Sequence, residues 1–169
     1  MKKRKRNAIV PILWIFFAVT TAGIAYLSFQ NGEEAKKLGE QLVLYLAQNI
    51  KHKQNVSAAE LSALTYDIRQ GGRALAFLFL GIIGTAAVHL SCPKLNWVVK
   101  TIFTAGLLLA IAFLTEKLKV YIPSRHYSYE EMMISITAVI VGFLAVSLLT
   151  LTVSALKGFF RLMAASHLL

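Results

Sequence analysis

Six ionisable side chains beside long apolar segments are the residues of this sequence best suited to binding or proton transfer. Arginine guanidinium groups bind phosphate or carboxylate through paired hydrogen bonds, and nearby glutamates can orient them. Glutamate and histidine can also act as general acids or bases. The candidates are Arg69, Arg73, Glu116, Arg125, His126 and Glu131.

Other kinds of chemistry find little support in the sequence. No nucleophile–base pair and no nucleotide-binding motif can be named, and the single cysteine, Cys92, lacks the Cys/His neighbours typical of zinc sites. We therefore expect no metal and no cofactor. Cys92 is interpreted as a bystander at a membrane boundary, with a reactive or lipidated thiol as the alternative.

The composition indicates a membrane protein. Of the 169 residues, 57% are hydrophobic and only 15% are charged, and the mean hydropathy is +0.62. A soluble domain is typically about one quarter charged. The net charge of +10 is divided among short segments between apolar runs, which favours a role in membrane orientation over nucleic-acid binding.

Four segments are long and apolar enough to cross a bilayer, which requires about 20 residues. The first also resembles a signal peptide because it follows the basic run KKRKR, but its apolar stretch is too long and lacks a clean cleavage site, so we expect a retained helix. The predicted fold is all-α, a single domain over 1–169 built as a four-helix transmembrane bundle. The spans are predicted at about 8–29, 74–92, 97–115 and 132–156.

The distribution of basic residues predicts how the chain is oriented in the membrane. The basic run before the first span should remain in the cytoplasm. Alternation then places both termini inside and segments 30–73 and 116–131 outside. We therefore expect a multi-pass membrane protein whose six candidate residues lie near its outer surface.

The outer segment 30–73 is predicted to be helical. Leu38, Leu42, Tyr45, Leu46 and Ile50 recur at helical spacing, which predicts an amphipathic helix lying on the outer membrane surface. The sequence SAAE at 57–60 is typical of a capping box that begins a second helix. That helix should lead through the two glycines at 71–72 into the second span.

Helix faces predict which candidates point into the bundle. Arg73, Phe77 and Gly81 lie along one face of the second span. Below Glu131, small residues recur at spacings suited to close helix packing in membranes, so this face should be the packed one. This stripe consists of Ser135, Ala138, Gly142 and Ala145.

Structural roles are open for the same residues. Ser128 and Glu131 form a second S-x-x-E capping box, and Glu116 has Lys119 or Arg73 as an ion-pair partner. Arg69 and Arg73 can serve as headgroup anchors. Tyrosines at 121, 127 and 129 are typical of an interfacial aromatic belt.

Three blocks of this sequence resemble the VanZ-like family of bacterial membrane proteins. SFQNGEEAKKLGE is similar to its S-x-Q-x-G-E-E-S block, and IRQGGRALAFLFLG to R-K-x-A-H-F-x-E-Y-x-x-L-G, with Arg73 in place of the histidine. LTEKLKVYIPSRHYSYEEMMIS is similar to D-E-x-x-Q-x-x-x-P-x-R-x-x-x-x-x-D-x-x-x-N. In this block Glu116, Pro123 and Arg125 match, while Lys119 and Glu131 replace Gln and Asp. The family takes its name from a protein that gives low-level teicoplanin resistance, so the resemblance implies a role in glycopeptide tolerance.

Three functions are therefore considered. The first is a non-enzymatic envelope protein that binds an anionic lipid or cell-wall precursor through its arginines. The second is a small intramembrane enzyme that modifies an envelope lipid with Glu116, Glu131 or His126 as acid or base. The third, a transporter or channel subunit, ranks last because no charge lies deep in any span. Membrane lipids are the expected partners, nucleic acid is not, and the oligomeric state is left open.

Overall fold

The computed structural model describes residues 2–29, 37, 41, 45, 58–122 and 127–166. All regular structure in these residues is helical, which confirms the predicted fold class. Four long helices and one short 3-10 turn account for it. They are α1 (Lys2–Phe29), α3 (Ala58–Ser91), α4 (Trp97–Lys117), η1 (Leu118–Tyr121) and α5 (Tyr129–Ser166).

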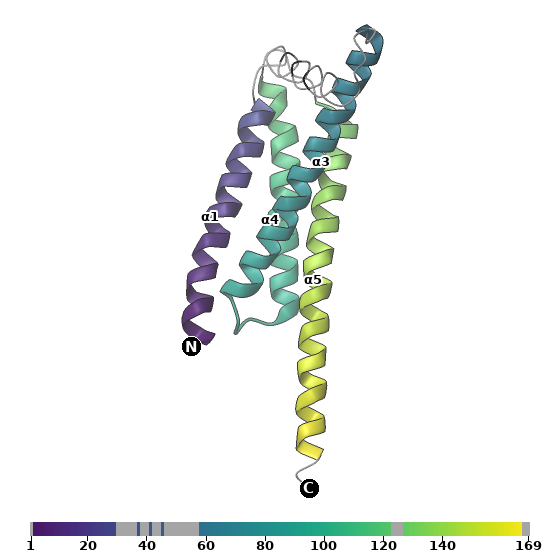
Figure 1. The fold of residues 1–169 in the computed structure, drawn as a ribbon. Helices are drawn as coiled ribbons and strands as arrows, with labels where there is room; N and C mark the ends of the chain where they lie inside the picture. Colours follow the sequence, from purple (N-terminus) through teal and green to yellow (C-terminus); the bar gives the residue numbers. More distant parts are fainter. Residues whose placement is uncertain are drawn as a thin grey trace.

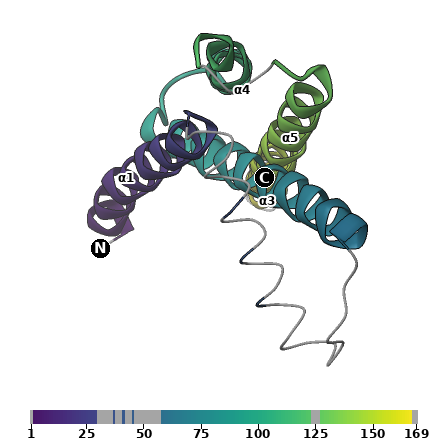
Figure 2. The ribbon, with the colours of Figure 1, turned by 90° about the horizontal axis from the view of Figure 1, so that it is seen from above.

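The long helices form one bundle with both chain termini at the same end (Figure 1). Helix α3 packs against α1, α4 and α5, and its contact with α5 is the most extensive. Seen from above, α3 runs between α1 and α5 (Figure 2). Helix α5 continues beyond the other helices at the end that carries the termini (Figure 1).

Each long helix contains an apolar segment that can cross a membrane. These segments are Ile9–Phe29, Ala63–Ser91, Trp97–Tyr121 and Tyr129–Phe160, and their most apolar windows have mean hydropathies of 2.0 to 2.5. The four-span prediction is therefore confirmed. All four long helices extend beyond the predicted spans: α1 begins at Lys2, α3 passes Gly71 and Gly72 without a break, α4 ends at Lys117, and α5 runs on beyond residue 156 to Ser166. Large apolar side chains such as Phe16, Ile102 and Leu149 are exposed, as expected for a surface in contact with lipid.

Two glycines set the crossing of α3 and α5. A Cβ atom added to Gly81 would lie 2.5 Å from the carbonyl oxygen of Val139 and 3.2 Å from the Cα atom of Gly142. Such small-residue contacts allow close helix packing in a membrane, where apolar burial gives little drive to associate. The prediction that Arg73, Phe77 and Gly81 lie on the inward face of α3 is thus confirmed at Gly81.

The predicted small-residue stripe on α5 is correct only in part. Ser135 and Gly142 are buried and Ala138 packs against the core, but Ala145 is exposed. Ser147 is buried in the next turn instead. Because α5 has 3.6 residues per turn and crosses α3 obliquely, the face in contact with α3 shifts along the helix.

Apolar residues below the charged end form the core. Phe77 and Leu80 of α3 pack with Leu108 of α4 and Val139 of α5, and Phe17 of α1 closes the side. Threonine hydroxyls inside the spans donate to backbone carbonyls one turn earlier, as Thr85 does to Gly81 at 2.6 Å. These threonine hydroxyls are therefore satisfied locally, as expected for apolar surroundings.

The predicted interfacial helix falls mostly outside the described residues. Within it only Lys37, Gln41 and Tyr45 are described, and they are helical and exposed. Ser57, the predicted cap of the following helix, also lies outside the described residues.

Candidate functional site

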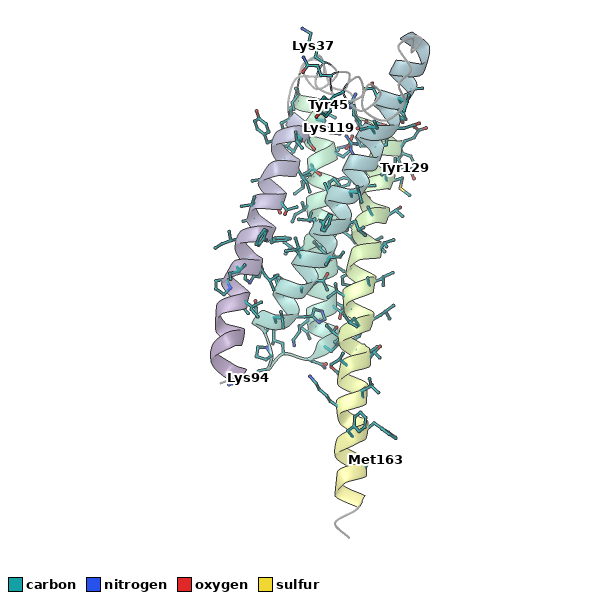
Figure 3. All side chains as sticks on the ribbon, in the orientation of Figure 1. Lys37, Tyr45, Lys94, Lys119, Tyr129 and Met163 are labelled. Atoms are coloured by element: carbon teal, nitrogen blue, oxygen red, sulfur yellow. The ribbon has the colours of Figure 1, made fainter. Side chains whose placement is uncertain are left out.

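Four charged side chains from three segments meet at the end of the bundle opposite the termini. We call Arg73, Glu116, Lys119 and Glu131 the charge cluster. Lys119 Nζ lies 2.7 Å from Glu116 Oε2 and 2.9 Å from Glu131 Oε2. Arg73 Nη1 forms ion pairs with the same two oxygens, at 3.4 Å from Glu116 Oε2 and in close contact with Glu131 Oε2. Each cation therefore bridges both carboxylates. Figure 3 labels Lys119 and Tyr129 at this end and Lys94 and Met163 at the other.

Local structure places each of these side chains. Helix α4 ends at Lys117, and the 3-10 turn η1 then brings Lys119 back beside Glu116. Ser128 caps α5 by accepting a hydrogen bond from the Glu131 backbone N–H at 3.4 Å, which sets Glu131 in the first turn. Arg73 lies one turn before buried Phe77, on the face of α3 that meets α5.

The charge cluster is partly buried, and its charges balance. The side chains of Lys119 and Glu116 are 1% and 3% exposed, whereas those of Arg73 and Glu131 are 15% and 18% exposed. Two positive and two negative charges sum to zero. Removing one partner from such a buried set is far more costly than removing an exposed pair, because it leaves an uncompensated charge.

The carboxylate oxygens are used unequally. All four cation contacts go to the Oε2 atoms, and Glu131 Oε1 accepts from Gln70 Nε2 at 3.4 Å. Glu116 Oε1 and Gln70 Oε1 are shielded from solvent and have no hydrogen-bond partner among the described residues. A buried polar atom without a partner costs about 1–3 kcal/mol, and more when it belongs to a charged group.

Arg73 retains donors that the carboxylates do not use. Only its Nη1 group contacts Glu116 and Glu131, and its Nη2 and Nε groups donate to no described residue. Neither group is among the solvent-shielded atoms that lack a partner. The guanidinium can therefore hold the two buried carboxylates with one nitrogen and offer the others to a ligand.

The structure brings together three of the six candidate residues. Arg73, Glu116 and Glu131 form the charge cluster, while Arg69 is exposed one turn before Arg73 and makes no ion pair with the cluster. Arg125 and His126 lie outside the described residues.

Two residues of the site were not among the candidates. Lys119 was considered only as the partner of Glu116 in an exposed pair, but it is the most buried member of the cluster. A 3-10 turn after α4 points it inward, and no pattern in the sequence indicates that turn. Gln70 is three residues before Arg73, so helical spacing was the signal that linked them.

The capping alternative for Glu131 is correct in one half only. The Ser128 hydroxyl caps the helix, yet the Glu131 carboxylate bonds to Arg73, Lys119 and Gln70 rather than turning back to Ser128. Glu131 therefore contributes its backbone to the cap and its side chain to the charge cluster. Tyr121, Tyr127 and Tyr129 are exposed nearby, as expected of a belt, and Lys117 Nζ lies 5.5 Å from the centre of the Tyr127 ring.

The opposite end of the bundle carries a smaller set of polar contacts. His89 Nδ1 lies 3.3 Å from Thr150 Oγ1, and Trp14 Nε1 donates to Ser91 Oγ at 2.8 Å. Cys92 is a half-buried free thiol. Within the described part of the chain no group of His, Cys, Asp and Glu side chains is arranged to hold a metal ion.

Comparisons of the chain with protein-family models, with curated proteins and with solved structures gave no match. Functional inference therefore depends on the charge cluster and on the membrane-spanning bundle that holds it.

Proposed function

We propose that this chain is a VanZ-like multi-pass protein of the bacterial plasma membrane that binds an anionic group of an envelope lipid or cell-wall precursor. Both termini would face the cytoplasm, and the charge cluster would lie at the outer surface. Binding there would contribute to teicoplanin tolerance or envelope homeostasis by holding or shielding the bound group.

The observation that carries this proposal is that Arg73 has hydrogen-bond donors that its ion pairs do not use. Its Nη1 group is fixed by two buried carboxylates, while Nη2 and Nε have no acceptor among the described residues. A guanidinium held in this way binds phosphate or carboxylate with less loss of side-chain freedom. Arg69, exposed one turn away, adds a second positive charge on the approach.

Binding is proposed rather than catalysis because the four cluster residues include no hydroxyl or thiol nucleophile. Both glutamates are also ion-paired with Arg73 and Lys119 through Oε2, an arrangement typical of structural or binding sites.

The test is phospholipid retention by the purified full-length chain, measured by native mass spectrometry. Arg69→Gln should lower the occupancy of phosphate-bearing lipids without disturbing the buried cluster, and Arg73→Gln should lower it further. Lys117→Gln is the matched control, since it removes an exposed positive charge at the same end of the bundle. Equal occupancy in all four proteins would contradict the proposal.

A cellular experiment tests the link to teicoplanin. Expression of the wild-type chain in a susceptible Gram-positive host should raise the inhibitory concentration, and Arg73→Gln should abolish this rise at equal membrane abundance. Retention of the phenotype by that variant would show that the charge cluster is only structural.

A further inference from the structure

We infer that the bound group belongs to a lipid headgroup that carries a primary ammonium as well as a phosphate, with the ammonium bound by Glu116. This inference rests on the proposed function, because it adds a second recognition element to the site of Arg73. Phosphate would bind the free donors of Arg73, and the ammonium would donate to Glu116 Oε1.

The unequal use of the carboxylate oxygens motivates this assignment. Arg73 and Lys119 both bond to Glu116 Oε2, and no described residue bonds to Glu116 Oε1. Glu116 is 3% exposed, so water does not compete freely for that oxygen. Glu116 Oε1 is thus a buried acceptor without a donor among the described residues, and an N–H group on the ligand would supply one.

Charge balance selects the class of headgroup. The charge cluster is neutral as it stands, with Arg73 and Lys119 opposite Glu116 and Glu131. A phosphate alone would add a negative charge beside the neutral cluster, with only the exposed Arg69 to offset it among the described residues, and an amine alone would add a positive charge. A headgroup with both charges keeps the site neutral, which avoids the penalty of burying a net charge.

A primary ammonium is favoured over a hydroxyl or a quaternary amine. Bonds between a charged donor and a carboxylate are about twice as strong as neutral ones. A glycerol headgroup donates only from neutral hydroxyls and leaves the phosphate charge unbalanced. A trimethylated amine has the right charge but no N–H group, so it cannot satisfy Glu116 Oε1.

The position of the cluster favours a lipid over a soluble compound. Arg73, Glu116 and Lys119 lie within the apolar segments Ala63–Ser91 and Trp97–Tyr121, and Glu131 begins the segment Tyr129–Phe160. Headgroups occupy the depth at which such segments end. Because Glu116 Oε1 is shielded from solvent, a ligand reaches it only when the atoms covering it move, so binding should be measured at equilibrium.

The experiment compares four lipids that share one phosphate and one positive charge. Phosphatidylethanolamine, its N-methyl and N,N-dimethyl forms and phosphatidylcholine offer three, two, one and no N–H donors. Native mass spectrometry of the purified full-length chain in defined lipid mixtures should show occupancy falling along this series. We expect roughly a tenfold difference between its ends, as for loss of one charge-assisted hydrogen bond.

Variants locate the effect. In Glu116→Gln the four lipids should show equal occupancy. Glu130→Gln, which removes an exposed carboxylate outside the cluster, should keep the wild-type differences in occupancy. Equal occupancy of the four lipids in the wild-type chain would overturn the ammonium assignment. The proposed function would nevertheless stand if binding still depended on Arg73. If occupancy in Glu116→Gln still falls from phosphatidylethanolamine to phosphatidylcholine, the ammonium assignment is also overturned, because the ammonium then binds elsewhere.

Two further binding experiments test which class of headgroup is bound and whether the ligand comes from the membrane. Phosphatidylglycerol should occupy the site less than phosphatidylethanolamine, and the reverse order would refute the ammonium assignment. Soluble glycerophosphoethanolamine should not displace the lipid, and efficient displacement would contradict a membrane source. If the wild-type chain binds none of these phospholipids, this inference fails, and the proposed function is then confined to a cell-wall precursor.

Discussion

Gly81 and Gly142 face each other where α3 crosses α5, and a Cβ atom added to either would lie 3.2 Å from the Cα atom of the other. Arg73 is two turns from Gly81 along α3, and Glu131 is three turns from Gly142 along α5. The crossing therefore sets the distance between the two helices at the level of the charge cluster. Close contact of two glycines in the apolar region thus positions an ion pair near its edge.

Gly142→Ala should destabilise the protein, because the added methyl group would meet the backbone of α3 at Gly81 and Ile82. Overpacking of this kind costs about 1–3 kcal/mol. Thermal unfolding in detergent should show a lower midpoint for this variant. Gly106→Ala is the matched control, since a Cβ atom there meets nothing within 4 Å, and alanine is the better helix former. Equal midpoints for the two variants would show that α3 and α5 can separate without cost.

Lys119→Met should destabilise the protein strongly. Lys119 is 1% exposed and bonds both glutamates, so its loss would leave Glu116 and Glu131 with Arg73 as their only cation among the described residues. Removal of one partner from a buried ion pair costs about 3–5 kcal/mol. The free energy of unfolding in a denaturant titration is the measurement.

Lys117→Met provides the control for Lys119→Met. Lys117 is exposed, and its described contact is with the Tyr127 ring. An exposed cation–π pair contributes about 0.5–1 kcal/mol, so this loss should be much the smaller of the two. Comparable losses for the two variants would mean that Lys119 is not buried among the carboxylates.

Ser128→Ala and Glu131→Gln should separate the cap of α5 from the charge cluster. Ser128 contributes only a cap to this region, and replacing a cap by alanine costs about 0.5–2 kcal/mol. Phospholipid occupancy should therefore stay near the wild-type level in Ser128→Ala. Glu131→Gln should lower both stability and occupancy, because Arg73 loses its closest carboxylate. If Ser128→Ala lowers occupancy as much as Glu131→Gln does, the two roles of this turn are not separable.

The spans and much of the site could be predicted from the sequence, and the reasons are physical. Long apolar runs predict membrane helices because unpaired backbone groups are not tolerated in lipid. Helical spacing placed Arg73 above Phe77 and Gly81, and a stripe of small residues placed Glu131 on the packed face of α5. The structure brings both residues to the same point.

Lys119 and Ala145 show where such reasoning fails. Lys119 follows the end of α4, and its direction depends on whether the chain continues as α-helix, 3-10 turn or loop. Small differences in free energy decide between these states. Ala145 fits the spacing of the stripe, but the oblique crossing of α5 over α3 turns it outward. Both outcomes depend on contacts between helices, which periodicity within one helix does not contain.

Cys92, the only cysteine of the chain, allows a direct test of the predicted orientation. It lies just after α3, at the end of the bundle that carries both termini (Figure 1). If the basic N-terminal run holds that end in the cytoplasm, a membrane-impermeant maleimide should label Cys92 in inverted vesicles and not in right-side-out vesicles. Because Cys92 is half-buried, Lys94→Cys in a Cys92→Ser background supplies an exposed thiol in the same turn. Glu130→Cys in that background should give the opposite pattern, since it lies beside the charge cluster. Reversed labelling of both positions would place the charge cluster in the cytoplasm and would contradict binding of an outer-surface ligand.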